Sequence, residues 1–83
     1  MKTTKYFDHT RKRPDRASID LKWIKFTMSN YERKEIQTDG RVRLWAKIIQ
    51  NENRYLRVIL LEDSETVHNA FFDRSFKGKE NED

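Results

Sequence analysis

The sequence predicts an α+β fold, in which one main N-terminal helix packs on an antiparallel sheet of about four strands. Up to residue 28, apolar residues recur at helical spacing, whereas after Tyr31 they alternate with polar residues as strands do. A chain of 83 residues is also long enough for one domain only. We therefore expect a single domain at residues 1–76 and a disordered tail at residues 77–83.

The main helix is predicted over residues 15–28. Pro14 suits the position just ahead of a first helical turn because its ring fixes φ, and Asp15 favours the positive end of the helix dipole. On a helical wheel, one narrow stripe combines Ala17, Leu21, Ile24 and Met28. This stripe should face the core.

A second apolar set falls on the opposite side of the same helix, and it consists of Ile19, Trp23 and Phe26. One buried stripe cannot accommodate both sets, so something else should cover the second. Two interpretations are open. Either the N-terminal arm folds over the set, with Phe7 or Tyr6 as the covering side chain, or the set is an exposed patch that binds a partner protein.

The alternating part of the sequence predicts the strands. Residues 33–38 and 41–49 should pair as a hairpin around Asp39-Gly40, a strong turn signal. Residues 55–61 are nearly all apolar, which is typical of a central strand. A turn at residues 62–65 then leads into a fourth strand at residues 66–72.

Composition narrows the functional classes. The chain has no cysteine, so disulfides and zinc–thiolate sites are excluded. Cores of domains near this size supply only ~3–5 kcal/mol, so a partner chain or a homodimer is a reasonable expectation. No apolar run has the length of a signal peptide or a membrane span, and we expect a cytoplasmic protein.

The net charge of +4 is concentrated at the N-terminal end. Residues 1–25 contain eight Lys and Arg against three Asp, a balance of +5, whereas residues 26–76 contain eight basic and eight acidic residues. A polyanion should therefore be attracted to the first part of the chain.

One face of the second strand predicts a nucleic-acid surface. Its apolar face consists of Val42, Leu44, Ala46 and Ile48, and its other face consists of Arg41, Arg43, Trp45 and Lys47. Cations there can meet phosphates, and Trp45 can stack a base. The alternative is an ordinary solvated sheet face on which Trp45 shields apolar area.

The last strand supplies candidate catalytic groups. Strict alternation places His68 on the face of Ala70 and Phe72, with Asn69 on the other face. A neutral imidazole can take the 2′-hydroxyl proton of RNA, and the fork of Arg74 can stabilise a phosphorane-like transition state. The alternatives are a structural histidine bonded to backbone and a salt bridge from Arg74 to a neighbouring acid.

A further basic group surrounds the start of the helix and consists of His9, Arg11, Lys12, Arg13 and Arg16. It is either an electropositive site with one titratable side chain or a plain solvated surface. Two histidines 59 positions apart fit no metal motif, and two glycines leave no nucleotide-binding loop, so we expect no cofactor. Metal-free RNA cleavage suits these groups best, because RNA supplies its own nucleophile.

Several segments together resemble a known family. His9 with Arg13 and Arg16, the helix with Trp23-Ile24, and the segments 39–43, 56–59 and 66–74 are similar to the small BrnT-like domains grouped with RelE-type toxins. The similarity covers roughly residues 6–77. It implies a compact fold of the barnase–colicin–RelE ribonuclease-like group and an mRNA-directed toxin held inactive by a cognate antitoxin. It also assigns Arg41 and Arg43 to the family's basic second strand.

The sequence thus predicts a metal-independent endoribonuclease, the toxin of a type II toxin–antitoxin system. His68 or His9 would act as acid or base, with phosphate bound by Arg41, Arg43 and Arg74. One alternative is a non-catalytic nucleic-acid-binding or regulatory module that uses the same basic surface. Another is a small partner-binding protein. Whether His9 and His68 share one site depends on how the arm packs, which the sequence leaves open.

Overall fold

The computed structural model describes residues 1–76, and the tail predicted at residues 77–83 lies outside the described residues. Three helices precede the sheet: α1 (Lys5–Thr10), α2 (Pro14–Ala17) and α3 (Leu21–Asn30). The strands are β1 (Arg33–Ile36), β2 (Val42–Ile48), β3 (Arg54–Leu60) and β4 (Val67–Phe72), with a short 3-10 helix, η1 (Ile49–Asn51), between β2 and β3.

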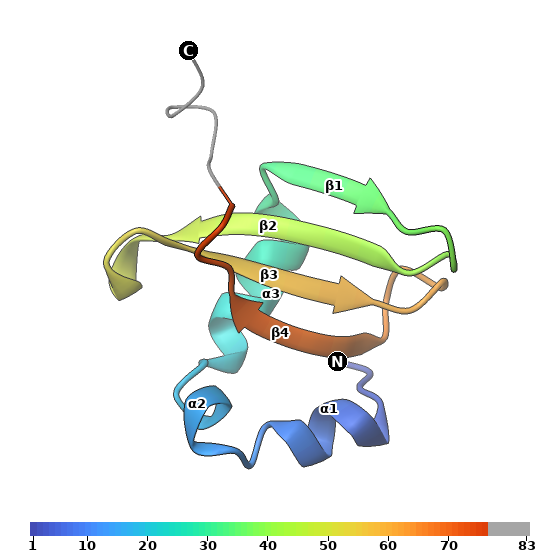
Figure 1. The fold of residues 1–83 in the computed structure, drawn as a ribbon, viewed down its shortest axis with the longest axis horizontal. Helices are drawn as coiled ribbons and strands as arrows, with labels where there is room; N and C mark the ends of the chain where they lie inside the picture. The colour runs from blue at the N-terminus through green and yellow to red at the C-terminus, as the bar shows by residue number, and fades with distance from the viewer. Residues whose placement is uncertain (77–83) are drawn as a thin grey trace.

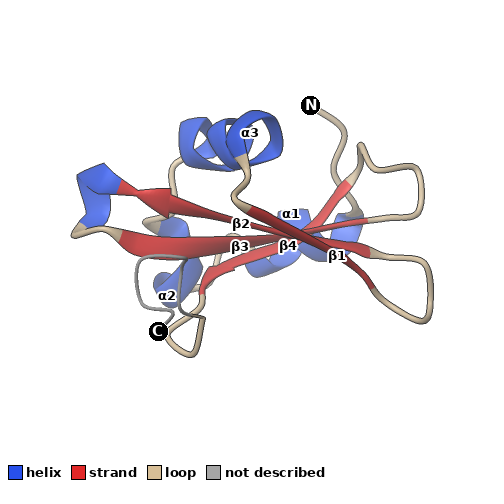
Figure 2. Cartoon of the chain, turned by 90° about the horizontal axis from the view of Figure 1, so that it is seen from above, coloured by secondary structure: helices blue, strands red, loops and turns tan. Residues whose placement is uncertain are grey.

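The four strands form one antiparallel sheet in the order β1-β2-β3-β4 (Figure 1). Figure 2 shows α3 lying across one face of this sheet. Figure 1 shows α1 and α2 alongside β4. The predicted α+β fold, with a main helix packed on a four-stranded antiparallel sheet, is confirmed.

The prediction of one continuous helix over residues 15–28 is wrong, because the chain breaks at residues 18–20. Asp20 has an extended backbone conformation, and its carboxylate accepts a hydrogen bond from the Lys22 N–H at 2.9 Å. It is therefore the N-cap of α3. Ala17 is exposed at the end of α2, whereas Ile24 of α3 is buried in the core.

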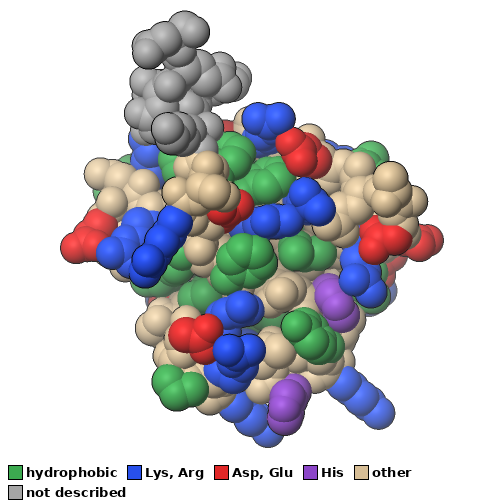
Figure 3. All heavy atoms as spheres, in the orientation of Figure 1, with side chains coloured by type: hydrophobic (Ala, Val, Ile, Leu, Met, Phe, Trp, Pro, Cys, Tyr) green, Lys and Arg blue, Asp and Glu red, His purple; other side chains and the backbone are tan. Residues whose placement is uncertain are grey.

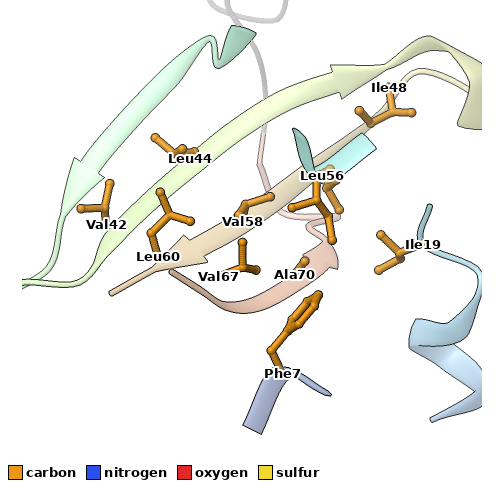
Figure 4. Packing of buried hydrophobic residues seen from close by; sticks show 11 residues of the cluster. Phe7, Ile19, Val42, Leu44, Ile48, Leu56, Val58, Leu60, Val67 and Ala70 are labelled. Atoms are coloured by element: carbon orange, nitrogen blue, oxygen red, sulfur yellow. The ribbon is translucent and has the colours of Figure 1, made fainter. Parts of the chain in front are cut away.

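The break also changes the second apolar set. Ile19 precedes α3 and is buried in the same core cluster as Phe7 of α1 (Figure 4). Trp23 is partly buried, with its ring edge-on to Phe72, whereas Phe26 is 47% exposed. The three residues therefore do not form one exposed patch, and neither interpretation describes the whole set: Ile19 is buried in the same cluster as Phe7 of the arm, whereas Phe26 is exposed.

The N-terminal arm is an ordered part of the sheet edge. The Thr4 N–H donates to the Val67 carbonyl at 3.0 Å, and the Val67 N–H donates to the Lys2 carbonyl at 2.9 Å. Thr4 then caps α1, because its Oγ1 accepts from the Phe7 N–H at 3.0 Å. The arm therefore lies along β4 and fixes α1 beside it.

The strand register confirms the apolar face of β2, whose four predicted core residues are all buried. It corrects β4. Ile59 pairs with Asn69 but Leu60 pairs with Val67, so His68 is the extra residue of a β-bulge. Both Val67 and Ala70 are buried, and His68 does not share the face of Ala70 and Phe72 as strict alternation predicted.

Candidate nucleic-acid interface

The bulge places His68 against the N-terminal arm. Its Nδ1 lies 3.1 Å from Thr4 Oγ1, and its ring stacks on Tyr6 with centroids 4.8 Å apart and an angle of 22° between the rings. Burial lowers the pKa of His68 below its usual 6.5, and the positive charge of Arg41 lowers it further. The imidazole is therefore neutral at pH 7.

His9 belongs to the same surface as His68. Tyr6 and His9 are three residues apart in α1, so their side chains lie on the same side of that helix, one turn apart. Tyr6 is half exposed and stacks on His68, and His9 lies one helical turn after Tyr6. Figure 3 shows the histidine side chains on one face of the molecule. We refer to His9, Tyr6 and His68 as the histidine surface.

The basic residues after α1 have different roles. Arg13 forms an exposed ion pair with Asp15 at 3.4 Å, a kind of pair that contributes little to stability. Arg11 lies over the Phe7 ring at 5.9 Å. Arg16 is held more firmly, because its Nη1 donates to Asn69 Oδ1 at 2.7 Å. Arg16 therefore anchors α2 to β4 as well as adding positive charge.

Trp45 does not lie open for a base to stack on. It is 4% exposed, and the Phe76 ring stacks on it with centroids 5.0 Å apart. Its Nε1 donates to Asp73 Oδ2 at 3.0 Å, and the Arg57 guanidinium lies 5.4 Å from its ring. The interpretation of Trp45 as a residue that shields apolar area fits this arrangement.

The cationic side chains of β2 and of the turn before it each lie close to a carboxylate or an aromatic ring. Arg41 lies 3.8 Å from Asp39, and Arg43 lies 3.9 Å from Glu35. The Lys47 ammonium lies 5.7 Å from the centre of the Tyr55 ring. The positive charge predicted for this face is present, but carboxylates beside two of its cations reduce its net attraction for phosphate.

A groove of about 790 Å³ lies at the end of β4. Three guanidinium groups line it, and they belong to Arg16, Arg54 and Arg74. Its other lining residues include Asp15 and Asp73 and four aromatic side chains, Tyr55, Phe71, Phe72 and Phe76. Arg54 was not among the residues predicted from the sequence, because it lies between the predicted strands at residues 41–49 and 55–61, and only its pairing with Ile48 shows where it lies.

Arg74 is separated from His68, so the structure does not bring the predicted catalytic residues together. Arg74 follows the end of β4, whereas His68 lies near its beginning. At ~3.3 Å per residue, the Cα atoms of His68 and Phe72, the last residue of β4, are already roughly 13 Å apart, and Arg74 lies in the turn beyond Phe72. Arg74 belongs to the groove, and the histidine surface consists of different residues.

Asp73 stays ionised at the edge of the groove. Burial alone would raise its pKa, but hydrogen bonds from Ser75 and Trp45 and the charge of Arg57 together lower it. Arg57 Nη1 lies 3.6 Å from Asp73 Oδ2, and both side chains are largely buried. The carboxylate of Asp73 is thus neutralised within the fold.

Within residues 1–76, no three His, Cys, Asp or Glu side chains are grouped so that they could hold a metal ion. The helices in this part of the chain are too short or too polar to cross a membrane. Comparison with protein-family models, with curated proteins and with solved structures finds no match to the chain. The similarity to RelE-type toxins stays a prediction, and function is inferred from the geometry of these side chains.

Proposed function

We propose that the protein is a metal-independent endoribonuclease whose acid and base are His9 and His68. The observation that supports this most is the histidine surface itself. One imidazole stacks on Tyr6 and is neutral at pH 7, and the other belongs to the same short helix as Tyr6, one turn further on. A pair of titratable groups, one neutral and one able to carry a proton, is what RNA transesterification requires.

His68 is the base in this proposal. In this proposal the Nδ1–H of His68 donates to Thr4 Oγ1, 3.1 Å away, and the lone pair of Nε2 takes the proton of a 2′-hydroxyl. The 2′-oxygen then attacks the adjacent phosphorus, and the bond from phosphorus to the 5′-oxygen breaks. His9, protonated, gives its proton to that leaving oxygen. The products are a 2′,3′-cyclic phosphate and a free 5′-hydroxyl.

The cations of the arm contribute charge stabilisation. Arg11, Lys12 and Arg13 follow directly after α1 and are near His9 in the chain. Positive groups fixed beside a phosphodiester stabilise the charge that develops in its transition state. In this proposal they take the role that the sequence suggested for Arg74.

The resemblance to RelE-type toxins suggests the biological setting. We place the protein in the cytoplasm, where its substrate would be cellular RNA. It would be the toxin of a type II system, and an antitoxin protein would hold it inactive.

A second candidate function is RNA binding without cleavage. The separation of Arg74 from His68 favours it, because the guanidinium predicted to stabilise the transition state follows the end of β4 whereas His68 lies near its beginning. The same surfaces would then bind RNA and regulate it, with the histidines in structural roles.

The test is cleavage of a 5′-labelled RNA in EDTA by the wild type, by His68→Gln and by His9→Gln. We expect wild-type fragments that end in 2′,3′-cyclic phosphate. Each variant should be slower by roughly 10²–10⁴-fold, with its affinity for RNA nearly unchanged. Lys34→Gln, at an exposed position on β1, is the control and should cleave normally.

Intact RNA in the wild-type reaction at saturating protein would exclude the nuclease and leave the binding function. Equal cleavage by the wild type and both histidine variants would point to a contaminating enzyme or to other catalytic residues. Because all proteins are purified in the same way, a contaminating nuclease would cleave RNA equally in the wild-type and variant preparations.

A further inference from the structure

We infer that the groove at the end of β4 binds single-stranded RNA, with phosphate on Arg54 and Arg74 and an unpaired base on Phe76. The proposed function supplies the identity of the polymer, but the site itself is distinct from the histidine surface. A volume of about 790 Å³ is within the usual range for sites that hold small organic ligands, so a nucleotide fits it.

The cations of the groove are available for phosphate. Arg54 pairs with Glu52 at 3.0 Å, but both side chains are mostly exposed, and such a pair exchanges readily for a stronger partner. Arg74 has no ion pair among the described residues. Guanidinium groups bind phosphate through two parallel hydrogen bonds, a geometry that suits both side chains.

The carboxylates of the groove do not cancel this charge. Asp73 is already paired with Arg57 and accepts from Trp45 and Ser75. Asp15 lies between Arg13 at 3.4 Å and Arg16 at 3.5 Å. Each acid of the groove lining thus has its own cation, so Arg74 is left to bind phosphate, together with Arg54 once it exchanges its exposed partner Glu52.

The aromatic side chains favour an unpaired base. Phe76 is half-buried, stacks on Trp45 at an angle of 13° and lies 4.9 Å from the Tyr55 ring, so a base bound against Phe76 would join an existing aromatic cluster. Bases in a duplex are stacked on each other and cannot enter such a stack, whereas single strands can. The combination of guanidinium and aromatic groups therefore selects single strands.

Arg16 connects the groove to the strand that carries His68. Arg16 lines the groove and also donates to Asn69, the residue next to His68. A strand that leaves the groove along β4 would therefore reach His68. In this arrangement the groove holds one part of the RNA while the histidine surface acts on another part.

Binding can be tested without cleavage. The probe is a short single-stranded oligoadenylate, labelled with a fluorophore, in which every 2′-hydroxyl is methylated so that no transesterification can occur. Arg54→Gln and Arg74→Gln should each weaken binding by about tenfold, the effect of losing a charged hydrogen bond. Each should also reduce the salt dependence of log K by about 0.7–1.

Phe76→Leu separates stacking from charge. It should weaken binding by at least about fivefold and leave the salt dependence unchanged. A duplex of the same length should bind less tightly than the single strand. Lys34→Gln removes one exposed charge on β1, outside the groove, and serves as the matched control.

If Arg54→Gln and Arg74→Gln bind like Lys34→Gln, the groove is not the RNA site. If a duplex competes as well as the single strand, the inferred ligand class is wrong. Weakened probe binding without RNA cleavage by the wild type would support the groove and exclude the nuclease. If the groove variants bind the probe normally and cleavage depends on the histidines, the nuclease is supported and the groove is excluded as the RNA site.

Discussion

At the scale of single residues, His68 should make stability depend on pH. Burial, followed by the charge of Arg41, lowers its pKa in the folded state below 6.5, the value expected when unfolded. Between these two values the unfolded chain binds more protons, so the free energy of unfolding falls as the pH drops below 6.5. Urea titrations at pH 5 and pH 7 should show this loss, and His68→Gln should reduce it. An equal loss in His68→Gln would assign the effect to other groups, and His9→Gln is the control.

The sequence predicted the turn at Asp39-Gly40 but not the position of His68, and the difference has a physical reason. Asp39-Gly40 forms the expected turn, with Gly40 at φ 90°, because a positive φ is a local property that residue type reveals. The position of His68 depends on a bulge, and nothing local to β4 distinguishes a bulge from regular alternation. Its neighbours Thr4 and Tyr6 come from the other end of the chain, so only the fold brings them together.

At the scale of elements, α3 should be held to the sheet by Ile24. Ile24 is 1% exposed within the core cluster, whereas Phe26 on the same helix is 47% exposed. Ile24→Ala should lower the free energy of unfolding by about 2–5 kcal/mol. Phe26→Ala should change it by no more than about 0.5 kcal/mol, as surface substitutions do. Urea midpoints measure both, and the reverse order would show that α3 packs through its other face.

The strands were predicted closely, and the helices were not. Alternation of apolar and polar residues is set by the pleat and marks β2, and a nearly continuous apolar run marks β3, each to within a residue or two of the strand ends. The helical pattern at residues 15–28 did not indicate the break at residues 18–20, because Asp20 can either cap a helix or lie within one. Ile19 was the available signal. It fell outside the core stripe although it is apolar, and a break at residues 18–20 is what allows it to be buried.

At the scale of the whole molecule, the sheet face opposite α3 is closed by alternating cations and rings. Arg16 lies 5.2 Å from the Phe71 ring, and Arg57 lies 5.2 Å from Phe71 and 5.4 Å from Trp45. Cation–π contacts between partly buried groups are stronger than exposed ones. This series joins α2 and β4 to β3 and β2, so Trp45, which the sequence suggested as a base-stacking residue, instead stabilises the fold.

The pair of Arg57 and Asp73 lies within this series, and we expect it to be sensitive to loss of one charge. Asp73→Asn keeps an oxygen that can accept from Trp45 but leaves Arg57, whose Nε already has no hydrogen-bond partner in the described part of the chain, without its counter-charge. Breaking such a pair should lower the free energy of unfolding by about 2–4 kcal/mol, somewhat less than for a fully buried pair. Adding Arg57→Met to Asp73→Asn should restore most of it, because the charge is removed and the apolar stem still fills the space between the rings. Unfolding followed by tryptophan fluorescence measures both variants. If the double variant is less stable than Asp73→Asn alone, the guanidinium stabilises the face through its contacts with the rings and not through Asp73.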